Sequence, residues 1–257
     1  MRKGYTMNNT FDFKRFGQVV AFDWKRFIRN FGITLIVWIS LPVLFWLTTL
    51  IFDYELLVEE REMIMFSIVA ITLMSAPSRI YGKANLPREG VDFAMMPATS
   101  LEKFFSMFIY CSIVTPALTL LGSWIVDCLL TLLPFGGFKG IAMYEDFLRN
   151  TSFGDFMMLV VALVTIALTE SSIFMFGNMV FKRRKAAKTF AWGLLIVFSF
   201  IMIMQLFNFW ETFGTWVTNT SARLEQRFLL WVYSAFLLVI AIVFYVLTYR
   251  KIKNQKY

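Results

Sequence analysis

Several apolar runs of about 20 residues constrain the fold of this chain more than any other feature. A helix of that length spans the hydrocarbon core of a bilayer, where every backbone polar group must be bonded within the chain. Apolar side chains make up 58% of the 257 residues, and charged ones only 16%, against about a quarter in typical soluble proteins. We therefore predict an all-α, multi-pass membrane protein.

Six transmembrane helices are expected. They are predicted over residues 31–52, 63–80, 104–133, 156–181, 189–210 and 228–249. Pro42 and Pro116 fall inside the first and third spans and should kink them. Segment 1–30 is polar and aromatic and lacks the short apolar core of a cleavable signal peptide, and segment 250–257 is a basic tail.

The distribution of basic residues predicts the orientation. If both termini are cytoplasmic, the inner segments hold 20 of the 25 lysines and arginines, five of them in "KRRKAAK" (182–188). The first outer loop, "DYELLVEERE" (53–62), carries five acids against a single arginine, Arg61. This asymmetry follows the positive-inside rule. The basic residues are spread over four segments and not gathered in one patch, so we expect contact with anionic membrane lipid and no nucleic-acid partner.

The N-terminal segment 1–30 is predicted to form an amphipathic helix in the headgroup plane. Aromatic and apolar residues recur at helical spacings of three and four, with basic residues on the remaining surface. That face comprises Phe13, Phe16, Val20, Trp24, Phe27 and Phe31. An ordinary surface anchor explains this pattern more simply than a specific lipid site does.

Several classes of chemistry have no support in the sequence. Histidine is absent, which removes histidine-dependent catalysis and histidine metal ligands. Cys111 and Cys128 lie 17 residues apart in one predicted helix, about 25 Å along its axis, which is too far for a disulfide bond. No phosphate-binding G-x-x-x-x-G-K-[ST] loop occurs, and "PFGGFKG" (134–140) lacks its spacing. We therefore expect no enzyme in this chain, no cofactor and no metal.

The segment between the second and third spans is predicted to be a structured cytoplasmic loop, 81–103. Glycines and prolines interrupt it, and Thr99 and Glu102 then fit a helix-capping box. Met95 and Met96 would give a soft apolar surface that a partner could contact. The alternative is that these methionines pack against the ends of the membrane helices.

Two stretches resemble a known family. "GKANLPREGVDFAMMPATSLEKFFSMF" (82–108) resembles the segment after the second span in bacterial ABC exporter permeases of the type-2 family, particularly a Bacteroidetes group with an "LPAS-x-x-EKF" run. "SSIFMFGNMVFKRRKAAKT" (171–189) resembles the end of that group's fourth span. The resemblance implies a permease in the bacterial inner membrane, paired with a second permease subunit as a homodimer or heterodimer.

The resemblance also implies that segment 81–103 docks a separate ATPase subunit, which binds the ATP and Mg²⁺, and that segment 1–30 is an elbow helix that moves with it. The predicted docking residues are Arg88, Glu89, Phe93, Met95, Met96, Thr99, Glu102 and Lys103. A non-transporting membrane scaffold or sensor, holding a cytoplasmic partner through its basic loops, is the alternative. An intramembrane enzyme lacks any nucleophile–base or metal constellation.

Two acids, Asp127 and Glu170, lie well inside predicted spans, where ionised groups are costly and often functional. Asp127 is about 9 Å from the outer end of its span, so we expect it to reach water or a headgroup. Glu170 is about 13 Å deeper, too far for a carboxylate pair, and is expected to face the helix interior or a translocation cavity. Its candidate neighbours by depth are Trp38, Ser40, Thr115, Thr119 and Ser199. A purely structural hydrogen bond is the alternative.

Overall fold

The structure, a computed structural model, describes residues 11–86, 90, 93, 95–142, 153–206 and 222–254. These residues fold almost entirely into helices. In chain order they are α1 (Phe13–Ile39), α2 (Leu41–Phe52), α3 (Val58–Ile80), α5 (Ser100–Phe108), the π-helical turn η1 (Ile109–Val114), α6 (Thr115–Thr131), α7 (Phe153–Val180), α8 (Lys185–Leu206) and α10 (Ala222–Lys253). The all-α prediction is confirmed for this part of the chain.

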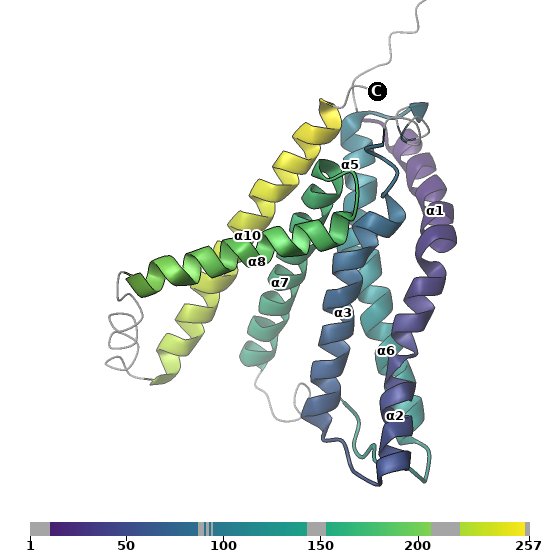
Figure 1. The fold of residues 1–257 in the computed structure, drawn as a ribbon, viewed down its shortest axis with the longest axis vertical. Helices are drawn as coiled ribbons and strands as arrows, with labels where there is room; N and C mark the ends of the chain where they lie inside the picture. Colours follow the sequence, from purple (N-terminus) through teal and green to yellow (C-terminus); the bar gives the residue numbers. More distant parts are fainter. Residues whose placement is uncertain are drawn as a thin grey trace, which may run out of the picture.

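Five helical stretches in the described residues are long and apolar enough to cross a membrane. They are Phe13–Phe52, Val58–Ile80, Ser100–Thr131, Phe156–Val180 and Leu230–Lys253. The predicted span 189–210 begins in α8, which runs obliquely across the other helices in Figure 1, and its last four residues lie outside the described part. A multi-pass membrane protein is therefore supported, while the sixth crossing stays a prediction.

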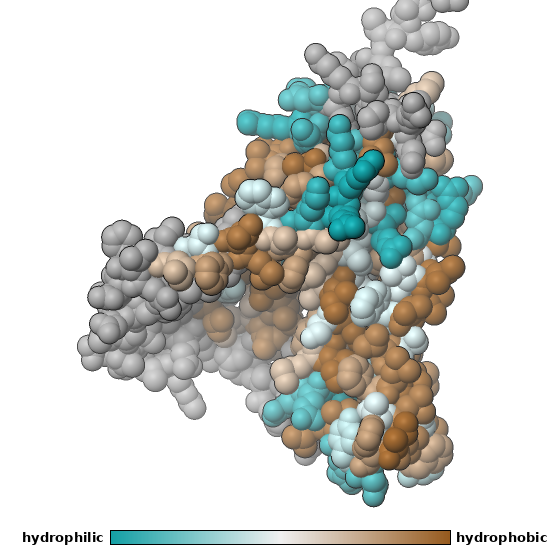
Figure 2. Space-filling model, viewed as in Figure 1, coloured by the Kyte–Doolittle hydropathy of each residue, from teal (hydrophilic) through white to brown (hydrophobic). Residues whose placement is uncertain are grey.

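The described ends of the chain lie at the same end of the molecule. Figure 1 shows α1 beginning and α10 ending together, and we call this the terminal end. The opposite end, where α2 leads into α3, is called the far end. Hydrophilic side chains gather toward both ends, with a mostly apolar band between them (Figure 2). This layout suits a membrane-spanning bundle; which end faces the cytoplasm stays a prediction.

Both predicted proline kinks correspond to breaks in regular α-helix. Pro42 falls in the first turn of α2, directly after the break at Ser40 that separates α2 from α1. Pro116 is in the first turn of α6, which follows the π-helical turn, and the Thr115 hydroxyl donates to the Tyr110 carbonyl at 2.7 Å. Proline lacks an N–H and clashes with the preceding turn, so the helix must open there.

The segment expected to lie flat in the headgroup plane is continuous with the first span. Helix α1 has no break near residue 30, and its buried stripe is Val19, Asp23, Phe27, Phe31 and Leu35. Of the predicted face, Phe27 and Phe31 are buried in the main core, whereas Phe13 is 82% exposed and Trp24 44%.

The buried stripe of α1 differs from the predicted one because it includes the charged residue Asp23. Asp23 finds hydroxyl partners on neighbouring helices, and the stripe therefore follows a spacing of four residues through it. Phe16 and Val20 are only partly buried at its margin. The polar partners that make this possible come from other helices, so the periodicity of segment 1–30 alone could not place the stripe.

Candidate functional site

The end of the predicted docking loop is joined to α1 by a charged cluster. Thr99 caps α5 as predicted, accepting a hydrogen bond from the Glu102 amide while the Glu102 side chain bonds the Thr99 amide at 2.9 Å. The same carboxylate accepts from Arg15 Nε at 2.8 Å and Nη2 at 2.7 Å, and from the Asp12 amide at 3.0 Å. Glu102 is fully buried, so it acts as an internal tie between α5 and the start of α1.

A second tie joins α1, α3 and α5 through Asp23. Its buried carboxylate accepts hydrogen bonds from Ser106 at 2.6 Å and from the Tyr81 hydroxyl at 2.9 Å, and it pairs with Arg26 at 3.1 Å. Tyr110 adds a bond to the Val20 carbonyl at 2.7 Å. A buried carboxylate needs such partners, because an unpaired charge is expensive to desolvate. Sequence reasoning missed Asp23, whose one signal was an acid at helical spacing from Val19 and Phe27.

The beginning of the loop is tied to α7 and α8. Asn85 donates to the carbonyls of Met179 at 3.1 Å and Phe181 at 2.9 Å, and Lys185 donates to Gly82 and to the Asn85 side chain. Burial lowers the pKa of Lys185 to about 8. The turn at 81–86 therefore links the end of the second predicted span to the junction of the fourth and fifth.

An open groove lies between these ties, on the terminal end of α1. It has a volume of about 410 Å³ and runs between the first half of α1 and residues 95–97. Its lining is mixed in character: Arg15, Gln18, Val19, Phe22, Met95, Met96 and Pro97. Met95 is 77% exposed at the groove. A flexible apolar side chain beside polar residues suits a surface that packs against another protein.

The predicted docking residues that the structure describes separate into three groups. Met95 and Met96 line the groove, and their contact with a partner stays a prediction. Phe93 is only 3% exposed, and its carbonyl accepts a 2.7 Å bond from the buried Lys103 ammonium, so both are internal supports and not part of a contact surface. Thr99 and Glu102 act within the capping box and the Arg15 tie. Arg88 and Glu89 lie outside the described residues.

Asp127, expected to reach water or a headgroup, is instead buried at 1% exposure. It lies 3.5 Å from Arg61, which the sequence placed in an outer loop but which belongs to the first turn of α3. The Arg61 guanidinium also stacks on Phe138 at 4.8 Å and donates to the Gly140 carbonyl at 2.6 Å. The ion pair offsets part of the cost of burying both charges, while neither Asp127 oxygen accepts a hydrogen bond among the described residues.

Glu170 is partly buried on α7, and its Oε1 is shielded from solvent and has no hydrogen-bond partner among the described residues. The hydroxyls of Thr115 and Thr119, predicted at its depth, bond their own helical segment at 2.7 and 2.8 Å. The neighbouring Ser171 instead joins Ser112 and Tyr245 in a hydroxyl cluster. Of the candidate neighbours, Thr115 and Thr119 therefore donate no hydrogen bond to Glu170 in the described residues.

Within the described part of the chain, no group of three or more histidine, cysteine, aspartate or glutamate side chains could hold a metal ion. The groove beside Met95 is a candidate functional surface because it is open and presents an exposed apolar side chain beside polar ones. Comparison of the chain with protein-family models, with curated proteins and with solved structures finds no match.

Proposed function

We propose that this chain is the membrane permease subunit of an ABC exporter, powered by a separate ATPase subunit that docks beside Met95. The observation that carries this proposal is that polar contacts connect the segments beside an exposed groove to several membrane helices. Met95 is 77% exposed, while the chain on either side is held by partly buried polar ties to α1, α7 and α8. Such a surface can receive a partner and pass its movement into the membrane.

The ties define two routes for that movement. A displacement of residues 95–97 reaches α1 through the Arg15–Glu102 ion pair, whose atoms are 2.7 Å apart. A displacement of the turn at 81–86 reaches the α7–α8 junction through Asn85 and Lys185. Closure of two ATPase subunits would then rock these helices against those of a second permease subunit and alternate the access of the pathway.

The resemblance of segments 82–108 and 171–189 to type-2 ABC exporter permeases supports the same assignment, including an inner-membrane location and a homodimeric or heterodimeric assembly. The five long apolar helices agree with a permease. A scaffold or sensor would use the same groove to hold its partner but would not couple that partner to transport.

The test changes Met95 and Met96 together to aspartate and measures whether a separate ATPase subunit still co-purifies with the chain from its native membrane. We expect the variant to lose co-purification of the ATPase, because a charge at the centre of an apolar contact is poorly solvated. Thermal unfolding should change little, since Met95 is exposed. Leu57→Asp is the matched control, because Leu57 is an exposed apolar residue at the far end.

Retention of the complex by the Met95/Met96 variant would overturn the docking site. Loss of the complex from the Leu57 control as well would indicate general damage and likewise count against it. If the wild-type complex forms but no candidate substrate stimulates its ATP hydrolysis after reconstitution, the scaffold function replaces the exporter.

A further inference from the structure

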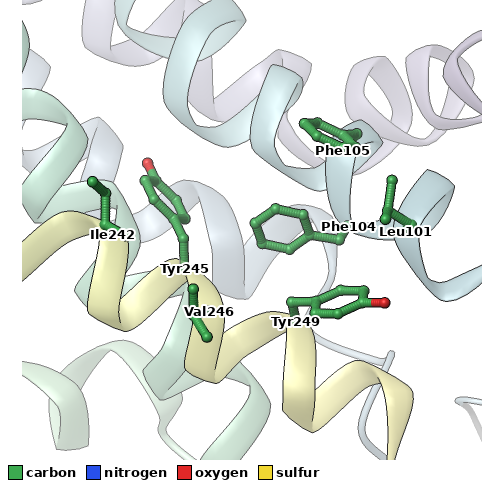
Figure 3. Close-up of a pocket in the computed structure, with 7 residues that line it drawn as sticks. All are labelled: Leu101, Phe104, Phe105, Ile242, Tyr245, Val246 and Tyr249. Atoms are coloured by element: carbon green, nitrogen blue, oxygen red, sulfur yellow. The ribbon is translucent and has the colours of Figure 1, made fainter.

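A second groove lies between α5 and α10, on the membrane-spanning part of the terminal end. It has a volume of about 270 Å³, and its exposed lining is wholly apolar (Figure 3). Helix α5 supplies Leu101, Phe104 and Phe105, and α10 supplies Ile242, Tyr245, Val246 and Tyr249. No residue that lines this groove also lines the groove beside Met95.

Aromatic packing shapes the groove. The Phe104 ring lies edge-on to Tyr245 and Tyr249, with centroids 6.1 and 5.9 Å apart. The Tyr245 hydroxyl is bonded to Ser112 at 2.8 Å and Ser171 at 2.7 Å, so its polar atom is already engaged with other helices. The groove therefore offers a preformed channel whose exposed lining is apolar, and Tyr249 carries the other hydroxyl among its lining side chains.

Basic residues lie directly beyond one end of the groove. Lys253 is one helical turn after Tyr249 and continues the groove face of α10, whereas Arg250, one turn after Val246, lies at the margin of that face. Lys251 lies on about the opposite side of the helix, roughly 180° from that face. Arg250, Lys251 and Lys253 are all exposed. An apolar channel that ends at two cations matches a molecule with an apolar chain and an anionic head.

We propose that the α5–α10 groove binds one acyl chain of an anionic phospholipid, whose phosphate contacts Arg250 and Lys253. Tyr249 is the groove-lining residue next to Arg250 in the sequence, and aromatic side chains are enriched at membrane–water interfaces. A second copy of the chain is a poorer occupant. A two-fold contact between parallel α10 helices would bring both basic clusters together, and like charges repel.

The experiment is native mass spectrometry of the full-length protein purified in detergent and incubated with dioleoylphosphatidylglycerol or dioleoylphosphatidylcholine. The two lipids share acyl chains and differ in net headgroup charge. We expect preferential retention of the anionic lipid. Lys253→Gln should weaken that retention roughly fivefold, the effect of about one basic residue near an anionic headgroup. Lys251→Gln removes the same charge from the opposite side of α10 and should leave retention unchanged.

A second variant tests the channel itself. Val246→Trp fills the groove from a position that is already 45% exposed, so folding should be preserved, and it should reduce retention of both lipids. Arg250→Gln provides an independent test of the headgroup contact and should behave as Lys253→Gln does.

Three results would overturn the proposal. Equal losses for Lys251→Gln and Lys253→Gln would show diffuse attraction to the basic end of α10. Unchanged retention in Val246→Trp would show that the lipid binds elsewhere. A two-chain species that Val246→Trp separates would assign the groove to a second copy. None of these measurements involves the ATPase, so failure here leaves the docking proposal intact.

Discussion

The two ends of the molecule both carry a buried charge pair, but they surround it differently. At the far end, Arg61 and Asp127 are 2% and 1% exposed, and the cavity beside them has a volume of only about 10 Å³. At the terminal end, Glu102 is fully buried but Arg15 is 24% exposed and borders a groove of about 410 Å³. One pair is enclosed, and the other adjoins open surface.

This difference predicts two different roles, one pair fixing a loop in place and the other transmitting the movement of a partner. At the far end, the Gly140 carbonyl, the Phe138 ring and the Asp127 carboxylate all contact Arg61, so the pair fixes the loop after α6 onto α3. At the terminal end, the Glu102 carboxylate joins two chain segments next to a surface that is free to receive a partner. We therefore expect the far-end pair to dominate stability and the terminal-end pair to matter more for coupling.

The largest effect is expected from Asp127→Ala. It leaves Arg61 buried without its charged partner, which typically costs about 3–5 kcal/mol. Thermal unfolding in detergent should show a large loss of stability. Glu55→Gln is the control, because it breaks the exposed pair with Lys139 at the same end, where about 1 kcal/mol or less is expected. Similar losses in both variants would remove the distinction between an enclosed and an exposed pair.

A smaller effect is expected from Glu102→Gln. Glutamine can still complete a capping box, so the change mainly removes the charge that Arg15 and the Asp12 amide contact. We expect a loss of about 1.5–3 kcal/mol in stability and a clear reduction of substrate-stimulated ATP hydrolysis by the assembled complex. If the Asp127 variant loses coupling and the Glu102 variant keeps it, the assignment of the two ends is reversed.

The smallest effect concerns Lys185, which lies outside the candidate membrane spans. Burial lowers its pKa from 10.5 to about 8, so the folded protein releases this proton before the unfolded chain does. Its contribution to stability should therefore rise with pH between about 8 and 10.5, and be constant below that window. Lys185→Met should remove this rise in thermal unfolding. Lys188→Met, one turn further along α8, should retain it, and identical profiles for all three proteins would contradict the linkage.

Much of the fold followed from patterns that are local in the chain. Apolar runs long enough to span a bilayer predicted helices because an isolated backbone in hydrocarbon has to bond to itself. Pro42 and Pro116 marked the breaks because the missing N–H and the ring clash act within one turn. Thr99 and Glu102 marked the start of α5 because a capping box is also a local signal that spans only four residues.

Tertiary structure alone decided which polar groups are buried and what they do there. Asp127 was expected near water and is enclosed, because Arg61 from another helix supplies its counter-charge across 66 positions of sequence. Asp23 is inside for a similar reason, and Phe93 and Lys103 support the loop from within and do not form its contact surface. The burial of a charge depends on partners that the fold brings from elsewhere, and no local pattern contains them.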